Sequence, residues 1–199
     1  MHPNSKFQLT DRDEMAEIVR QVGFGMIVAQ TPDGLRPAHV PVLVDGERVL
    51  FHLSRGNSLH DTLAGGCEGL IVVDGPHAYI SPDWYGLEDR VPTWNYVAVE
   101  LTGPVSPLDR DGLVDLVDRL SEAHERRLAP KPAWRKGKMT PGRYEGLLKA
   151  ITGFELGIRE WRGTAKIDQD KPPEVRARLA AALRGQGEEA MARLMDPQA

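Results

Sequence analysis

Apolar residues recur at helical spacing in two stretches of the chain. In residues 11–22 they follow Asp11 and Glu14, which resemble an N-cap and its reciprocal partner, and Gly23 ends the pattern. In residues 109–128 they fall on one stripe that a helix would bury, formed by Leu113, Leu116, Val117, Leu120 and Ala123. Shorter helices are predicted over residues 57–63, 144–150, 174–184 and 188–194.

Short runs of apolar and β-branched residues predict strands, over residues 24–30, 35–44, 48–54, 69–74, 77–81, 94–105 and 152–161. Turn sequences separate them, among them Thr31-Pro32-Asp33-Gly34 and Asp45-Gly46. Pro37 and Pro41 have no amide hydrogen to donate to a ladder, so we expect residues 35–44 to lie at a sheet edge or to contain bulges.

The predicted strands follow one another mostly in hairpin order. They do not alternate with helices in the way that implies a parallel sheet. This order predicts a mainly β fold with peripheral helices, built on a small antiparallel barrel. We expect the barrel domain, with its inserted helices, to span residues 1–165, and a C-terminal helical extension packed on the same domain to span residues 166–199.

Composition and charge exclude several classes of protein. The 199 residues are 41% hydrophobic and 27% charged, which is ordinary for a folded chain. The net charge of -4 argues against a protein that binds nucleic acid through its phosphate backbone, so we expect the basic stretches at residues 126–143 and 176–184 to be solvated surface. The single cysteine, Cys67, allows no internal disulfide, and the histidines are too scattered for a metal site.

Two observations bear on location. No apolar run approaches the ~20 residues that a membrane-spanning helix needs. The segment Met1–Lys6 has no apolar region of the kind found in signal peptides. We therefore expect a cytoplasmic protein with no membrane partner.

Two long segments have unusual sequences: Gly75–Tyr85 reads GPHAYISPDWY and Val91–Tyr96 reads VPTWNY. Both resemble the signature segments of the PaiB family, FMN-binding proteins described as negative transcriptional regulators. Shorter resemblances at residues 38–41, 51–57 and 150–154 extend the similarity over residues 1–171. The resemblance implies an FMN-binding split β-barrel, similar to pyridoxamine phosphate oxidases and flavin reductases, in which two subunits pair and FMN lies in a groove between them.

One segment departs from the family pattern. Residues 166–171 read KIDQDK where the family usually reads KLSQNR, so Asp170 stands in place of an asparagine. The resemblance therefore assigns no role to this segment.

A flavin phosphate needs donors from amides, hydroxyls or cations. The turn Ser54-Arg55-Gly56-Asn57-Ser58 supplies such groups directly before a predicted helix, although a solvated turn with an N-cap would have the same composition. Within the family pattern we predict that Arg55, Asn57 and Ser58 contact the phosphate. His52, just before the turn, either donates there as well or is a half-buried strand histidine bonded to a backbone carbonyl.

The strand that contains Ala38-His39-Val40-Pro41 resembles the family strand beneath the flavin ring. The resemblance implies cofactor contacts at His39, Val40 and Pro41, with backbone groups near Pro41 and Val42 at the polar edge of the ring. A histidine that is simply packed on an apolar strand is the alternative for His39.

Large aromatic residues gather within residues 84–96 of a chain that is only 6% aromatic. His77 and Tyr79 alternate with small or apolar residues, so they share one face of a strand. We predict that His77, Tyr79, Trp94 and Asn95 form one wall of the flavin groove, partly contributed by a second subunit. An ordinary aromatic core or a dimer interface would show the same pattern.

These features predict FMN as the cofactor and a homodimer with the flavin groove at its interface. We expect a PaiB-like negative transcriptional regulator or a flavin-based sensor, with a small molecule or a protein as a further partner. No helix-turn-helix is recognisable, so regulation would be indirect. The alternative is an FMN-dependent oxidoreductase or flavin reductase acting on a small molecule. The flavin would supply the redox chemistry, so no catalytic residue is assigned, and no metal is expected.

Overall fold

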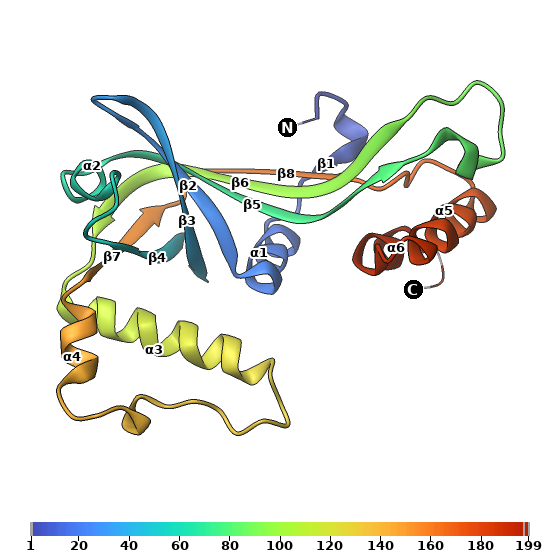
Figure 1. Cartoon of the computed structure of the whole chain (residues 1–199). Helices are drawn as coiled ribbons and strands as arrows, with labels where there is room; N and C mark the ends of the chain where they lie inside the picture. The colour runs from blue at the N-terminus through green and yellow to red at the C-terminus, as the bar shows by residue number, and fades with distance from the viewer. Residues whose placement is uncertain (1, 197, 199) are drawn as a thin grey trace. The chain divides into compact units, whose positions relative to one another are not determined.

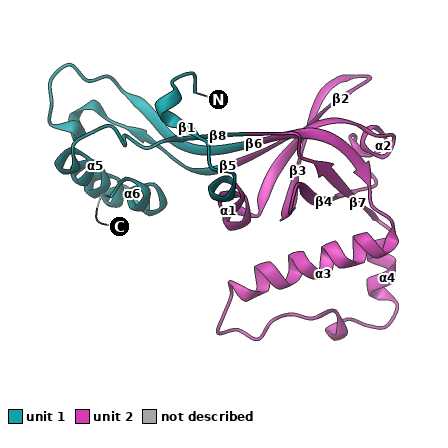
Figure 2. Cartoon of the chain, turned by 180° about the vertical axis from the view of Figure 1, so that it is seen from behind, with its two compact units in different colours: residues 1–15, 74–99, 162–199 teal, residues 16–73, 100–161 magenta. Residues whose placement is uncertain are grey.

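The computed structural model describes residues 2–196 and residue 198. The chain forms two compact units: residues 1–15, 74–99 and 162–199 belong to unit 1, and residues 16–73 and 100–161 belong to unit 2 (Figure 2). Residues 1, 197 and 199, which the predicted domain and extension include, lie outside the described residues. The division of the chain after residue 165 stays a prediction.

Eight strands and six α-helices make up the described residues, together with three short 3-10 helices (Figure 1). The strands are β1 (Gln8–Leu9), β2 (Phe24–Thr31), β3 (Gly34–Asp45), β4 (Arg48–Ser54), β5 (Cys67–Ile80), β6 (Thr93–Pro107), β7 (Ile151–Gly157) and β8 (Glu160–Lys166). The helices are α1 (Arg12–Val22), α2 (His60–Ala64), α3 (Arg110–Arg126), α4 (Arg143–Leu148), α5 (Pro173–Gly185), α6 (Glu189–Met195), η1 (Ser5–Phe7), η2 (Pro82–Tyr85) and η3 (Lys136–Lys138). Among the described residues, no helix has the length and apolar character that a membrane crossing requires.

Unit 2 is a closed barrel. Its strand segments are hydrogen-bonded in the order β6-β5-β2-β3-β4-β7, and β6 also pairs with β7 at Val105↔Leu156, which joins the two ends of the series. Alternate side chains of each strand point inward and form the core. Phe51 of β4 stacks on Phe154 of β7 inside the barrel, and both are fully buried.

Helix α3 covers the outer face of β3 and β4. The side chain of Asp109 caps the helix by accepting a hydrogen bond of 2.8 Å from the Gly112 amide. Leu116 and Leu120 of α3 pack with Leu50 of β4 in one buried cluster. This packing holds the helix beside the next outward-facing positions of the same two strands.

Unit 1 contains strand segments in the order β1-β8-β6-β5, so β5 is the edge strand there. Helices α5 and α6 close its core, which includes Ile80 of β5, Leu179 and Leu183 of α5 and Met191 of α6. The apolar side chains of α5 and α6 that recur at helical spacing are the ones that are buried.

The structure confirms the predicted fold class, mainly β and antiparallel with peripheral helices. Three predicted boundaries were wrong. Residues 69–74 and 77–80 belong to one continuous strand, because β5 is an edge strand at Pro76 and no ladder bond is lost there. Residues 152–161, predicted as one strand, contain most of β7 and the beginning of β8. Helix α2 begins at residue 60 rather than 57, because the Asn57 side chain accepts the Leu59 amide and holds a turn.

Candidate functional site

The outer face of β3 and β4 brings three of the predicted site residues together. The register Val42↔Phe51 and Leu43↔Leu50 places Val42 and Phe51 inside the barrel, where both are buried. Because side chains alternate, Pro41 and His52 point outward, and they line one pocket of about 250 Å³. His39 is two residues from Pro41 and is exposed on the same face, whereas Val40 is only 1% exposed and points inward. Val40 therefore offers a ligand only its backbone.

One edge of β3 carries free backbone groups. The β3–β4 register begins at Val42, so residues 34–41 pair with β2 alone among the described strands. The Val42 amide donates to the Gly23 carbonyl at 3.1 Å, so positions of the opposite parity face the free edge. These positions are Pro37, His39 and Pro41. Their carbonyls and the His39 amide are therefore available to hydrogen-bond a planar ring.

His52, which lines this pocket, has an unpaired polar atom. Its Nδ1 is buried and has no hydrogen-bond partner among the described residues. Burial lowers the pKa of His52, which keeps the imidazole neutral at neutral pH. A buried polar atom without a partner is costly to leave unpaired, so a ligand that bonds Nδ1 is the natural explanation for its position.

The turn after β4 presents donors that the protein does not use. Arg55 is anchored by its backbone amide, which donates to the Ala150 carbonyl at 2.9 Å, while its exposed guanidinium has no partner among the described residues. The side-chain Oδ1 of Asn57 accepts a hydrogen bond from the Leu59 amide, which leaves the side-chain amino group of Asn57 for a ligand. Ser58 is exposed. This donor set has the chemistry of a phosphate site.

Unit 1 holds the aromatic residues in a separate groove. His77 and Tyr79 of β5 each lie 6.2 Å from Trp94 of β6, measured between ring centroids. The three side chains line a groove of about 570 Å³ together with Trp84 and residues of α5 and α6. A groove of this size and aromatic lining suits a small organic molecule.

Asn95 lies in a buried polar cluster rather than in that groove. Its side chain is 0% exposed, and its amino group donates to Asp168 at 2.7 Å. The Tyr85 hydroxyl donates to the same carboxylate at 2.9 Å. Lys166 closes the cluster by donating to Thr93 Oγ1 and to the Trp94 carbonyl, each at 2.6 Å. Lys166 thus holds the start of β6, which carries Trp94, in place.

The segment that departs from the family pattern has a structural role. Asp170 accepts hydrogen bonds from Lys6 at 2.7 Å and from Lys171 at 2.9 Å. Gln169 donates to the carbonyls of Lys6 and Ala165. Residues 166–171 therefore attach the end of β8 to the N-terminal segment of unit 1.

We expect Asp170→Asn to lower the free energy of unfolding at neutral pH and to reduce its decline as the pH falls. The hydrogen bond from Lys6 lowers the pKa of Asp170 to about 2. A lowered carboxyl pKa stabilises the fold above the unfolded value, near 3.8, and this contribution is lost as the pH falls toward 2. Since the carboxylate is 30% exposed, the loss at neutral pH should be below about 1 kcal/mol. Urea unfolding between about pH 7 and pH 2 measures it, and a difference from wild type that persists at pH 2 would contradict the assignment.

Sequence reasoning missed the residues that face the predicted site from α3 and the loop behind it. His124, Glu125 and Trp134 line the pocket of Pro41 and His52. Glu125 is fixed there by accepting the Trp134 amide at 2.7 Å. Only the helical stripe of α3 hinted at this arrangement, because it predicted which face packs on the barrel.

The residues of unit 2 fit an FMN molecule. An unpaired buried imidazole nitrogen and an unused set of donors suit the phosphate end of the cofactor, and a free strand edge suits the polar edge of its ring. The groove of unit 1 has no arginine or lysine among its described lining residues, so it does not fit the phosphate group.

Comparison with known proteins identifies relatives. The sequence model of a family described as "Putative FMN-binding domain" matches residues 1–160. The chain is 30% identical over 169 residues to the protease synthase and sporulation protein PAI 2 of Bacillus subtilis, covering 83% of this chain and 80% of that protein.

Solved structures share the fold. The flavocytochrome Anf3 from Azotobacter vinelandii superposes with a TM-score of 0.60 at 13% identity, covering 83% of this chain and 72% of that one. The FAD and heme binding protein from Mycobacterium smegmatis superposes with a TM-score of 0.59 at 16% identity, covering 80% and 73%. These likenesses extend to the arrangement of strands and helices.

Proposed function

The chain belongs to this FMN-binding family, and on that premise we propose that it holds FMN along β3 and β4 of unit 2 and acts as a flavin-dependent regulator or sensor. The single observation that carries the placement is the unpaired Nδ1 of His52 beside a turn of unused donors. The relative from Bacillus subtilis, named for protease synthesis and sporulation, supports the regulatory role.

Each part of the site has one task in this proposal. Arg55, Ser58 and the amino group of Asn57 bind the phosphate. The free edge of β3 at His39 and Pro41 bonds the polar edge of the ring, and His52 Nδ1 bonds the cofactor near the phosphate. When bound, FMN supplies a ring that accepts and donates electrons. The neutral imidazole of His52 adds no charge to that environment.

A partly exposed apolar face of unit 2 supports a homodimer. On the outside of β2, β3 and β5 the register aligns Val28 with Pro37 and Leu70, and Met26 with Val72. Phe24 is 51% exposed beside them. We propose that a second copy covers this face and adds its own residues to the flavin groove, because a patch of this kind marks an interface. The mass of the flavin-loaded protein in solution tests this, and a monomer would contradict it.

A second candidate function is a flavin-dependent oxidoreductase acting on a small molecule. The groove at His77, Tyr79 and Trp94 favours it, since a sensor needs no room of about 570 Å³ for a substrate. Oxidation of a reduced nicotinamide cofactor by the flavin-loaded protein would favour the enzyme, and its absence the sensor. A cytoplasmic location and the wall contacts of His77, Tyr79 and Trp94 stay predictions, whereas Asn95 is buried away from the groove.

We expect Arg55→Gln to weaken FMN binding about tenfold, because it removes a charge-assisted contact to the phosphate. Riboflavin lacks the phosphate, so its affinity should not change. Arg143→Gln is the matched control, since Arg143 is also exposed and starts a helix elsewhere in unit 2. Flavin fluorescence titration measures the affinity of the wild type and of both variants for each flavin. Equal losses for FMN and riboflavin would place Arg55 away from the phosphate.

A further inference from the structure

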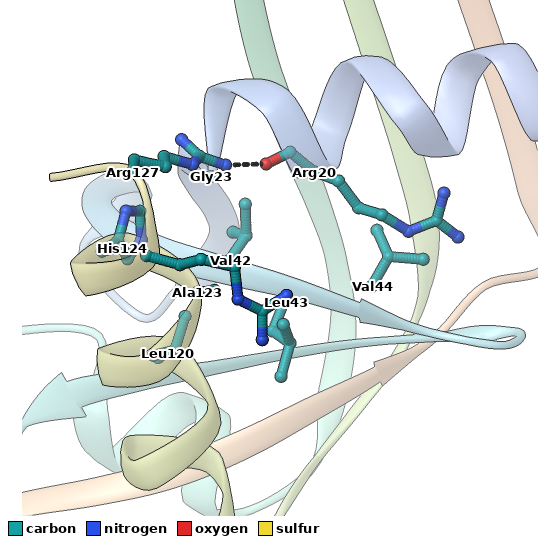
Figure 3. Close-up of a pocket in the computed structure, with 10 residues that line it drawn as sticks. Arg20, Gly23, Val42, Leu43, Val44, Leu120, Ala123, His124 and Arg127 are labelled. Carbon is teal, nitrogen blue, oxygen red and sulfur yellow. Dashed lines mark hydrogen bonds between the residues drawn. The ribbon is translucent and has the colours of Figure 1, made fainter. Parts of the chain in front are cut away.

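A second pocket of unit 2 lies between the end of α1, strand β3 and the C-terminal half of α3 (Figure 3). Its volume is about 340 Å³. Three arginines line it, Arg20, Arg126 and Arg127, together with His124. Leu43, Leu120 and Ala123 supply an apolar floor, so the pocket combines positive charge with a surface for a hydrocarbon body.

Arg127 gives the pocket a fixed wall. It donates to the Gln21 carbonyl at 2.8 Å and to the Arg20 carbonyl, a bond drawn in Figure 3. These bonds cap the last carbonyls of α1, which would otherwise face the pocket with partial negative charge. The negative end of this helix is therefore already neutralised before any ligand arrives.

The other two arginines are only weakly engaged. Arg20 lies 3.4 Å from Glu17, and Arg126 lies 3.0 Å from Glu122, each along the surface of its own helix. All four side chains are more than half exposed, and exposed pairs of this kind contribute little to stability. None of the described residues that line the pocket is acidic, although the whole chain carries a net charge of -4. The pocket is thus a local concentration of positive charge.

We propose that this arginine pocket binds a small organic anion, with a carboxylate or phosphate head on the guanidinium groups of Arg20 and Arg126 and a short apolar body on Leu43, Leu120 and Ala123. A volume of about 340 Å³ is in the lower range for small-molecule sites. Guanidinium groups match carboxylate and phosphate oxygens in geometry as well as charge.

The site goes beyond the proposed flavin function and does not require it. It shares Leu120 and His124 with the pocket of Pro41 and His52, so an anion bound there lies next to the proposed flavin position. In a sensor this anion is a second signal. In an oxidoreductase this anion would be the substrate, held near the cofactor.

Fluorine NMR of the flavin-loaded full chain tests the proposal with three probes: para-fluorobenzoate, para-fluorophenyl phosphate and the neutral para-fluorobenzyl alcohol. We expect saturable binding of one or both anions, little binding of the alcohol, and weaker binding as salt is raised. Arg20→Gln and Arg126→Gln should each weaken anion binding about tenfold. Arg193→Gln is the control, because Arg193 forms a pair of the same helical spacing with Glu189 outside the pocket.

Three results would overturn the proposal. Equal binding of the alcohol and the anions would leave only an apolar pocket. A folded protein that binds neither anion would show that the arginines are surface charges. If Arg20→Gln instead lowers the flavin content, read from visible absorbance, the pocket is part of the flavin site. Since Arg55→Gln reports on the flavin site separately, failure of one proposal is distinguishable from failure of the other.

Discussion

Replacing Gly103 with alanine is expected to destabilise the barrel by more than about 4 kcal/mol, a large part of the total stability of an ordinary protein. A Cβ at this position would overlap the carbonyl oxygen of Gly157 and approach the Arg159 amide to 3.3 Å. Both neighbours are backbone atoms, so no side-chain rotation relieves the overlap. They lie where β6 meets β7, the contact that closes the barrel through Val105↔Leu156.

The seam is also held by a backbone hydrogen bond of 2.9 Å from the Arg159 amide to the Thr102 carbonyl. Separating the strands enough to admit a methyl group would break this bond and expose the inner side chains of β6 and β7. Overlap with backbone is therefore expected to destabilise more than ordinary overpacking in a core, which amounts to about 1–3 kcal/mol.

Chemical unfolding of Gly103→Ala beside Gly146→Ala measures the effect. A Cβ at Gly146 meets nothing within 4 Å, and the residue lies inside α4, so alanine there should leave stability unchanged or raise it by up to about 1 kcal/mol. If Gly103→Ala accumulates only as insoluble protein while the control is soluble, the expectation holds. A Gly103→Ala protein that unfolds like wild type would show that β6 and β7 do not meet as described.

The fold could be predicted largely from local signals. Helices α1 and α3 carried an apolar stripe, α1 also had an N-terminal acidic cap, and both lie within two residues of their predicted bounds. Strands β2 and β4 were bounded by turn sequences. Local signals failed where the length of a strand depends on its pairing. Pro76 interrupts the sequence pattern but not the strand, because a proline breaks a strand only where its nitrogen faces a paired edge.

The candidate site was predictable where it follows the chain and unpredictable where distant segments meet. His39, Pro41 and His52 lie on adjacent strands at matching parity, so a hairpin reading brings them together. Asn95 follows Trp94 directly along the strand, so the alternation of side chains turns it into the interior. Trp134 reaches the pocket from the loop that follows α3, and no periodicity in the sequence reports where that loop returns.

Asp168 illustrates the same limit, because it sits in the segment to which the family pattern assigned no role. Its carboxylate is the acceptor shared by the Tyr85 hydroxyl and the Asn95 amino group, and it is 6% exposed. Its backbone has a φ of 54°, a region that aspartate and asparagine enter more readily than other residues. Position 168 thus requires both a short polar side chain and an acceptor.

We expect Asp168→Ala to destabilise the protein by about 3 kcal/mol or more, because it leaves two buried donors without an acceptor and places alanine at positive φ. Asp168→Asn keeps an acceptor oxygen and a tolerated backbone, so it should restore about half of the loss. A mutation that acted only through backbone strain would be rescued fully by asparagine. Urea unfolding of the three proteins separates these cases.

The alkaline limb of stability tests the same cluster by a different route. Burial first, and then the charge of Asp168, raise the pKa of Tyr85 well above its usual value near 10. The folded protein then keeps a proton that the unfolded chain loses, so this contribution is complete below about pH 10 and declines as the pH rises further. Tyr85→Phe has no phenol to ionise and should lose less stability than wild type between about pH 9 and pH 11, measured by guanidinium unfolding. The loss for Asp168→Asn should lie between those of wild type and Tyr85→Phe, because this variant removes the charge beside Tyr85 but keeps the phenol buried. Lys166 is present in all three proteins, so its titration does not distinguish them. Identical alkaline slopes in all three would mean that the Tyr85 hydroxyl is solvated and does not donate to Asp168.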